Sequence, residues 1–311
     1  MRSSRLQRLA CAPVVLLAFS FLAFLLPQLQ GVDEARATLF ARSQEAEPSE
    51  EALAAISAEL GLDDPLGVRY INYLGDVVTG DLGDSNVSRS PVAPQVWRAT
   101  VVSGTVVGLA IGLAVVLASI LGVVAATNEN RWPDRVITGV ARVLVAIPVH
   151  VVTPLLVYFL ALRFGLVPTG GWGEPKHLVL PVIALAISPV ALFSQIVRSE
   201  MLDTLEQPYI RTALVKGLKW HRVVWVHAAR VSLVGVLTLG SLFIAGLLGG
   251  AVIAEVILGV PGLGRLLHTA LTSSDVPLFQ GGLLIAVTAG IAIGLIGDVI
   301  SGILSPPERD Q

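Results

Sequence analysis

Few side chains that could do chemistry lie inside the long apolar stretches of this 311-residue chain. Glu255 and Asp298 are the acids there, and an acid within an apolar helix usually faces other helices or a watery path. Both are therefore candidates for lining a polar path; the alternative is that Glu255 reaches interfacial water while Asp298 pairs with a neighbouring helix. His150 has no second histidine four residues away, so a hydrogen-bonded packing role is favoured over a metal or proton-relay role, and no metal site is predicted.

The chain is not expected to be an enzyme or an ion-coupled transporter, because the residue motifs that these proteins need are missing from its sequence. A hydrolase within the membrane needs His-x-x-x-His with an acid, or a serine with a base, and the apolar stretches contain neither. An ion-coupled transporter needs a run of buried carboxylates or broken helices around an ion, whereas Glu255 and Asp298 lie far apart in depth. The Gly-rich loop that ends in Gly-Lys-Ser/Thr and cradles phosphates is also absent, so no cofactor is expected on this chain.

Composition indicates a polytopic membrane protein. The chain is 54% hydrophobic and 14% charged, outside the range of ordinary soluble domains. Apolar stretches that approach or exceed the roughly 18 residues needed to span a bilayer predict an all-α fold with six transmembrane helices. They cover residues 9–28, 101–127, 136–162, 178–197, 232–258 and 281–304. Pro148 and Pro154 in the third stretch and Pro181 and Pro189 in the fourth predict kinks in those two helices.

The distribution of basic residues predicts the orientation. These residues gather before the first stretch, between the second and third, and between the fourth and fifth, which places those segments and both termini in the cytoplasm. They are Arg2, Arg5, Arg8, Arg131, Arg135, Arg198, Arg211, Lys216, Lys219, Arg222 and Arg230. The largest alternate segment is rich in Asp and Glu and is expected outside. Since orientation accounts for the basic residues, nucleic acid is not an expected partner.

Four regions are expected along the chain. They are an N-terminal transmembrane helix (1–30), a small extracytoplasmic helical insertion (31–98), a five-helix core (99–305) and a cytoplasmic tail (306–311). Within the insertion, Ser49 is expected to cap a helix that ends at Gly61. A second helix should run from Pro65 to about Val78.

The core contains a cytoplasmic loop, 198–230, with two helical halves joined at Gly217. Pro208 suits the first position of the short first half. One face of this half collects Ile210, Ala213, Leu214 and Gly217, with Arg211 and Lys216 on its flanks. We expect such a stub to have few partners in its own chain. Because whole helices transmit force better than flexible loops, the pattern predicts a lever for another protein.

The same loop resembles the coupling loop of importer permeases of the ATP-binding-cassette class. The signature is Arg211-Thr212-Ala213, three residues, Gly217, nine residues and His227. Arg211 and Thr212 depart from the general Glu-Ala opening, but the stretch from Tyr209 to Leu218 is similar to the dipeptide, oligopeptide and nickel branch. Further motifs of that branch are Gly80-Asp81-Leu82-Gly83, His177-Leu178-Val179-Leu180-Pro181, and Gly249-Gly250-Ala251 through Glu255 to Pro261-Gly262-Leu263-Gly264. The branch usually has Pro-Gly-Asp-Pro where this chain has Gln30-Gly31-Val32-Asp33, which indicates a rearranged start of the insertion.

The resemblance implies a fold like that of type I importer permeases and a set of partners. These are a second homologous permease, cytoplasmic ATPase subunits that hold ATP and magnesium, an extracytoplasmic substrate-binding protein, and the lipid of a bacterial-type inner membrane. The implied cargo is a dipeptide or oligopeptide, with nickel chelates or haem as alternatives. The implied mechanism is alternating access driven through the coupling loop.

Position in the apolar stretches, together with the resemblance, predicts roles for individual residues. Glu255 and Asp298 are candidates for the translocation path. Residues Pro261, Gly262, Leu263 and Gly264 form a candidate outer gate or binding-protein contact, with an ordinary turn as the alternative. The residues implied to contact the ATPase are Tyr209, Ile210, Arg211, Thr212, Ala213, Lys216, Gly217 and Leu218.

Overall fold

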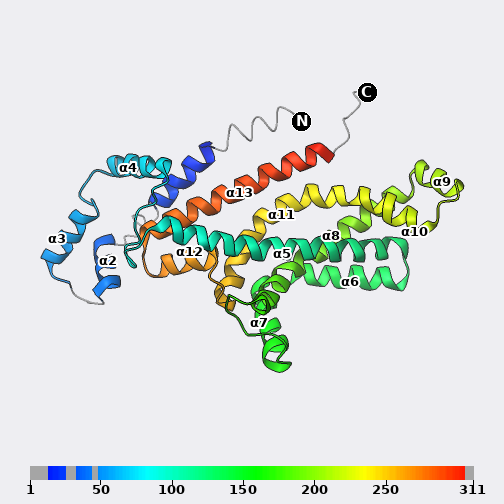
Figure 1. The fold of residues 1–311 in the computed structure, drawn as a ribbon, viewed down its shortest axis with the longest axis horizontal. Helices are drawn as coiled ribbons and strands as arrows, with labels where there is room; N and C mark the ends of the chain where they lie inside the picture. Colours follow the sequence, from blue (N-terminus) through cyan, green and yellow to red (C-terminus); the bar gives the residue numbers. More distant parts are fainter. Residues whose placement is uncertain (1–12, 26–32, 44–47, 305–311) are drawn as a thin grey trace. The chain divides into compact units, whose positions relative to one another are not determined.

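The computed structural model describes residues 13–25, 33–43 and 48–304, which are largely helical (Figure 1). Within these residues there is no β-strand, only an isolated antiparallel bridge between Asp84 and Pro91. The predicted all-α fold class is therefore confirmed. The main α-helices are Pro13–Leu25, α2 (Glu34–Ser43), α3 (Glu50–Glu59), α4 (Leu66–Thr79), α5 (Val92–Thr127), α6 (Trp132–Ala146), α7 (Val149–Leu156), α8 (Val179–Leu205), α9 (Pro208–Val215), α10 (Trp220–Arg222), α11 (Ala229–Leu258), α12 (Leu263–Thr272) and α13 (Val276–Leu304). The predicted tail, 306–311, lies outside the described residues.

The chain divides into two compact units. The first comprises residues 1–103 and 261–291, and the second comprises residues 104–260 and 292–311. Helices α5 and α13 each contribute residues to both units. The region boundaries expected at residues 30, 98 and 305 stay predictions.

Three of the described helices are long and apolar enough to cross a bilayer alone: Val92–Thr127, Pro175–Leu205 and Val276–Gly297. Two broken pairs, Trp132–Ala146 with Val149–Arg163 and Gly249–Leu258 with Leu263–Thr272, pass the same test together, which gives up to five spans. The helix Pro13–Leu25 is apolar but shorter, because the described residues cover only part of the predicted first stretch. The count of six transmembrane helices thus stays a prediction.

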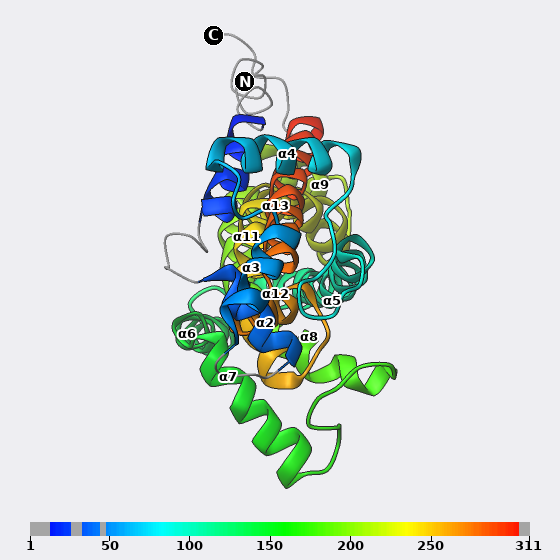
Figure 2. The ribbon, with the colours of Figure 1, turned by 90° about the vertical axis from the view of Figure 1, so that its left-hand side faces the viewer.

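The third predicted stretch is broken and not merely kinked. Helix α6 ends at Ala146, Ile147 adopts an extended conformation, and Pro148 precedes the first residue of α7. The two helices are bent by 105°, and Figure 2 shows α7 turning away from the end of α6. Pro148 has no N–H with which to continue the helical ladder, which explains the position of the break. By contrast, α8 continues through Pro189 without interruption.

In the predicted insertion region, helices α3 and α4 have ends that follow the predicted signals. The Ser49 side chain accepts a hydrogen bond from the Ala52 N–H and caps α3, as predicted. Gly61 follows α3 with φ of 63°, and Gly80 ends α4 with φ of 82°. Both lie in the left-handed region that glycine adopts without steric strain. Helix α2 was not predicted.

Helix α4 packs on Pro13–Leu25 through aromatic rings. The Tyr70 ring centroid lies 5.2 Å from that of Phe21 and 5.3 Å from that of Phe24. The Tyr70 hydroxyl is also 2.9 Å from Ser20 Oγ. Edge and tilted ring contacts of this kind add to the dispersion contacts between the two helices.

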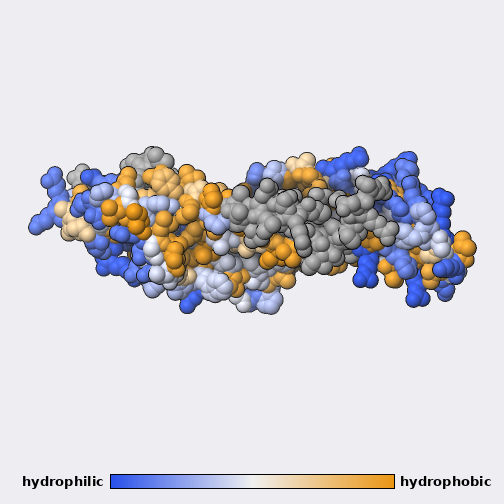
Figure 3. Space-filling model, turned by 90° about the horizontal axis from the view of Figure 1, so that it is seen from above, coloured by the Kyte–Doolittle hydropathy of each residue, from blue (hydrophilic) through white to orange (hydrophobic). Residues whose placement is uncertain are grey.

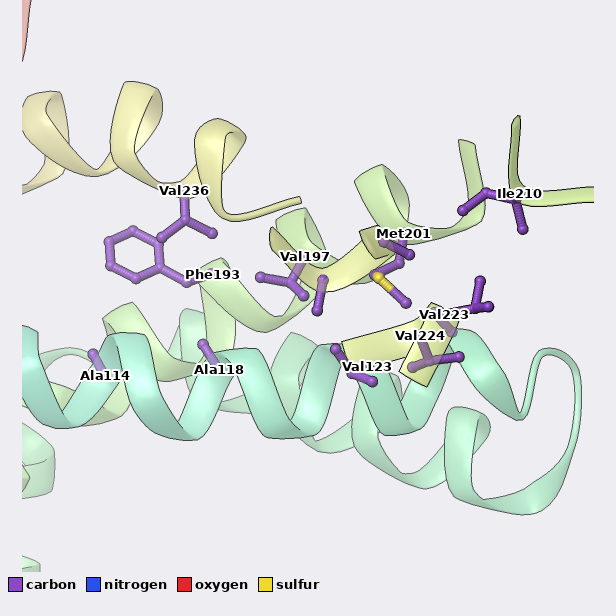
Figure 4. Packing of buried hydrophobic residues seen from close by; sticks show 13 residues of the cluster. Ala114, Ala118, Val123, Phe193, Val197, Met201, Ile210, Val223, Val224 and Val236 are labelled. Atoms are coloured by element: carbon purple, nitrogen blue, oxygen red, sulfur yellow. The ribbon is translucent and has the colours of Figure 1, made fainter. Parts of the chain in front are cut away.

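The second unit is held by a continuous apolar cluster. Ala114 and Ala118 of α5 face Phe193 and Val197 of α8, and Val236 of α11 closes the layer (Figure 4). Small residues let α5 approach α8 closely: a Cβ atom added at Gly122 would lie 2.6 Å from Val197 Cβ. In lipid, such close packing stabilises helix contacts more than removal of water does.

Candidate functional site

Helix α9 is the short helix expected in the cytoplasmic loop. Gln207 precedes it and Pro208 takes its first position, as predicted. At the other end the Gly217 N–H donates to the Leu214 carbonyl over 2.9 Å, and the Leu218 N–H donates to the Ala213 carbonyl over 3.2 Å. This pair of bonds is a Schellman motif, which requires the left-handed backbone that Gly217 adopts with φ of 83°. The chain then enters α10, so Gly217 separates two helical halves as expected.

The inner face of α9 is packed against its own chain. Ile210 is 1% exposed and belongs to the cluster that contains Met201, Val223 and Val224 (Figure 4). Ala213 and Leu218 pack against the same cluster. The expectation that α9 has few partners in its own chain is therefore wrong: a residue from each side of the loop, Met201 and Val223, seats the helix.

The outer face of α9 combines apolar and basic groups. Tyr209, Leu214 and Val215 are exposed, the last to 88%. Arg211 and Lys216 are exposed beside them. Figure 3 shows hydrophilic residues gathered over this end of the second unit, around the exposed apolar side chains. Leu214 was expected on the face of Ile210, but it lies on the exposed side because α9 turns only Ile210 and Ala213 inward.

An ion pair fixes the start of α6 to α8, which leads into α9. The Arg198 guanidinium donates two hydrogen bonds to the Asp134 carboxylate, from Nε over 2.5 Å and from Nη2 over 2.8 Å. Asp134 also accepts bonds from the Asn130 N–H and the Thr138 hydroxyl. Its side chain is 5% exposed, so the pair is largely shielded from water. This pair was not predicted, because Arg198 and Asp134 are 64 positions apart in the sequence and Arg198 alone looks like one of the basic residues that set orientation.

The two acids of the apolar stretches are placed differently. Glu255 is 0% exposed, one turn before the end of α11, where its carbonyl accepts the Val260 N–H. Nearby, the Gly171 N–H donates to the Leu258 carbonyl, and a Cβ atom at Gly170 would lie 2.2 Å from that oxygen. The end of α11 is therefore tightly enclosed. Asp298 belongs to α13, and its side chain lies outside the described residues.

The Pro261–Gly264 motif is the entrance to α12, a helix that the sequence analysis did not predict. Gly262 is the residue before the first turn, and the Leu263 N–H donates to Ser103 Oγ of α5 over 2.8 Å. A pocket of about 350 Å³ adjoins Pro261 and Gly262 and is lined by Arg98 and Arg265. The recurrence of Leu263, Leu266, Leu267 and Ala270 after a glycine is the signal that could have revealed α12.

The Gly80–Gly83 motif forms the turn after α4. The Asp81 carboxylate accepts the Gly83 N–H over 2.9 Å. A buried carboxylate then holds the following residues: Asp275 accepts bonds from the Ser85 hydroxyl and the Asn86 N–H. Within the described residues, no three histidine, cysteine, aspartate or glutamate side chains are grouped as metal ligands.

The family of this chain follows from its similarity to known proteins. Residues 118–309 match the family described as binding-protein-dependent transport system inner membrane component, and residues 1–117 match the N-terminal family of the same membrane components. This chain belongs to that family. The motif-based recognition of an importer permease is thereby confirmed, and the family's description places this transport component in the inner membrane.

Individual relatives extend along nearly the whole chain. The glutathione transport system permease protein GsiC of Salmonella choleraesuis is 32% identical over 304 residues, which are 98% of both chains. The dipeptide transport system permease protein DppB of Escherichia coli K12 is 33% identical over 297 residues, covering 85% of this chain and 87% of that protein. Helices α9 and α12 and Glu255 all lie within the matched inner membrane component.

Proposed function

We propose that this chain is a transmembrane permease subunit of an ATP-driven importer of short peptides. The observation that carries the proposal is its similarity, over most of its length, to permeases named for glutathione and for dipeptides. Both cargoes are short peptides. Nickel chelates or haem are the alternative cargoes of the same architecture, but neither of these two relatives is named for them.

In the proposed mechanism, ATPase subunits bind ATP with magnesium and drive the permease through α9. The mixed outer face supports this role: Tyr209, Leu214 and Val215 offer apolar contact, and Arg211 and Lys216 offer charge. The packed inner face supports it equally, because Ile210 ties α9 to the cluster of α8 and α5. Reversing a two-state equilibrium takes on the order of 5 kcal/mol, which a loosely attached helix would not transmit.

A second, homologous permease is proposed to complete the path. Helix α5 carries Gly104, Gly108 and Gly112 at four-residue spacing, and a Cβ atom at each would meet nothing within 4 Å in the described part of the chain. Such a face lets another helix approach closely. Glu255 and Asp298 are proposed for the path, and Pro261–Gly264 for an outer gate or binding-protein contact. An extracytoplasmic binding protein would deliver the peptide.

The test is reconstitution of the assembled transporter. The tagged chain should copurify with a second permease and with ATPase subunits. Proteoliposomes of this complex, supplied with a peptide-loaded binding protein, should accumulate a labelled dipeptide with ATP but not with a non-hydrolysable analogue. Competition by glutathione, a nickel chelate or haem would then rank the cargoes. Uptake driven by an ion gradient without ATP, or purification with no ATPase, would contradict the proposal.

A further inference from the structure

A polar pocket lies within the first unit, and none of its described lining residues belongs to the Pro261–Gly264 segment. It has a volume of about 300 Å³ and is formed by α4, the turn that follows α4, and the first turns of α13. The polar groups that matter for its chemistry are Asp64, Tyr73, Asp76, Asp81, Asn86 and Gln280. A volume of this order suits a small organic ligand and exceeds what a few bound waters need.

The pocket carries a net negative charge. Among the described residues of its lining, Arg69 is the basic one, and it is already paired with Glu34 over 3.1 Å. Its guanidinium also lies 5.8 Å from the centre of the Phe24 ring, which fixes it further. The carboxylates of Asp64, Asp76 and Asp81 make no ion pair with any described residue, so the pocket favours a cationic ligand.

Three polar side chains of the lining find no hydrogen-bond partner among the described residues. Asn86 is 6% exposed and Gln280 is 8% exposed, yet neither side-chain amide is bonded. The hydroxyl of Tyr73 is buried and likewise has no partner. A buried polar atom is nearly always hydrogen-bonded, so the unbonded Tyr73 hydroxyl, together with the two unbonded amides in the lining, indicates a ligand with donors and acceptors of its own.

The backbone of Asn86 is held from two sides, which fixes the side chain at the pocket. Its N–H donates to the Asp275 carboxylate over 3.1 Å, and its carbonyl accepts from Arg42 Nε over 2.7 Å. Asp275 itself is 1% exposed and also accepts from the Ser85 hydroxyl. A site whose polar groups are held in place before binding loses less entropy when the ligand arrives.

A metal ion does not fit this arrangement. The carboxylates of Asp64, Asp76 and Asp81 are not among any group of three metal-ligating side chains in the described part of the chain. An organic ammonium places fewer demands on carboxylate spacing, because it needs only nearby negative charge and hydrogen-bond acceptors. The unbonded side-chain amides of Asn86 and Gln280 could donate hydrogen bonds to a peptide carbonyl and accept one from a peptide N–H.

We propose that this pocket binds the amino end of a short peptide. The protonated amine lies by the carboxylates of Asp76 and Asp81, and the first peptide group bonds to the side-chain amides of Asn86 and Gln280. Identification of the ligand as a peptide rests on the proposed transport function. Preference for a protonated amine rests on the pocket alone.

The test measures binding to the purified full-length chain by calorimetry, with alanyl-alanine and N-acetyl-alanyl-alanine as probes. Acetylation removes the charge and retains the peptide group, so the acetylated probe should bind about tenfold more weakly or worse. Asp76→Asn should weaken binding of alanyl-alanine by about threefold or more. Asp63→Asn is the matched control, because Asp63 is an exposed acid outside the lining, and it should bind like the unaltered chain.

Gln280→Leu provides a second variant that leaves the charge of the pocket unchanged. It should weaken alanyl-alanine and its acetylated form by the same factor, since both carry the peptide group. Equal binding of the two probes, no detectable binding of either, or equal effects of Asp76→Asn and Asp63→Asn would overturn the pocket proposal. ATP-driven uptake by the reconstituted complex would be unaffected by that outcome, so failure of the pocket and failure of the transport function are separable.

Discussion

Gly217 is the residue on which the geometry of α9 depends most directly. Its φ of 83° lies in the left-handed region, whereas the space around it is open: a Cβ atom there would meet nothing within 4 Å. The requirement for glycine is therefore conformational and not steric. Leu218 follows at once and packs into the apolar cluster, so the backbone at Gly217 also sets where that side chain enters.

Replacing Gly217 should loosen the end of α9 without disturbing the core. Gly217→Ala is expected to destabilise the folded conformation at the end of α9 by about 1 kcal/mol, because a Cβ atom is disfavoured in the left-handed region. We expect reconstituted complexes to hydrolyse more ATP per peptide imported, measured by parallel phosphate-release and uptake assays. Gly139→Ala is the control: Gly139 lies within α6, also with open space around it, and the change should leave the ratio unaltered. An unchanged ratio for Gly217→Ala would contradict the lever role.

Tyr73 provides a pH-dependent signal of its own. Burial and, to a lesser extent, the neighbouring Tyr70 together raise its pKa to about 12. Since the folded-state pKa lies above the ordinary value, the folded chain favours the protonated phenol, and this contribution to stability is present below about pH 10 and is lost as the pH rises through about 12. Phenolate absorbance during a pH titration should show a late transition that Tyr73→Phe removes. Full ionisation of every tyrosine near pH 10 would refute it.

Local signals made several of these residues predictable. Ser49 and Pro208 begin helices as expected, because a cap or a first-turn proline acts through bonds to residues a few positions away. Gly61 and Gly217 end helices for the same reason. The burial of Ile210 was not predictable in this way, since it depends on Met201, before α9, and Val223, after it.

Among the elements, α6 and α8 show how a tertiary contact organises the cytoplasmic loop predicted from the sequence. Asp134 in the first turn of α6 receives both bonds of the Arg198 fork, and α8 continues directly toward α9. A bidentate pair fixes orientation as well as distance. The pair therefore joins the first turn of α6 to the helix that leads into α9.

Breaking this pair should destabilise the second unit. Asp134→Asn removes the carboxylate partner of the Arg198 side chain, which is 25% exposed. We expect the free energy of unfolding to fall by about 1–3 kcal/mol. Thermal unfolding of the purified chain in detergent measures the change. Asp203→Asn is a matched control on α8, because Asp203 is exposed and its carboxylate makes no described ion pair. Equal melting temperatures for the two variants would show that the pair adds nothing.

The sequence predicted some elements better than others. Composition and length were enough for α5, α8 and α13, because each is a long uninterrupted apolar run. The break between α6 and α7 was expected only as a kink, since a proline marks a position and does not set an angle. Helix α12 was missed because its ten residues are too few for a span and follow Pro261 and Gly262, which read as a turn.

At the scale of the whole molecule, exposed apolar side chains are the dominant feature. Val116 and Ile120 of α5 are 57% and 45% exposed, and Val143 of α6 is 61% exposed. Soluble proteins seldom leave so many large apolar groups uncovered, whereas the lipid around a membrane protein covers them. The family to which the chain belongs agrees with this explanation, whereas orientation in the membrane stays a prediction.

Two exposed valines test the orientation in one experiment. Val78 on α4 is 86% exposed and Val215 on α9 is 88% exposed, so a cysteine at either position should be reachable without disturbing the core. The single native cysteine, Cys11, is first replaced by alanine. A membrane-impermeant maleimide should label Val78→Cys in right-side-out vesicles and Val215→Cys in inverted vesicles.

The same pair separates orientation from coupling. If α9 contacts the ATPase, adding the ATPase subunits to inverted vesicles should protect Val215→Cys from the maleimide, because the partner covers the exposed face of the helix. Val78→Cys should react equally with and without them in right-side-out vesicles. Labelling of Val215→Cys from the outside would reverse the proposed topology. If Val215→Cys is labelled in inverted vesicles at the same rate with and without the ATPase subunits, the topology stands but α9 is not part of the coupling interface.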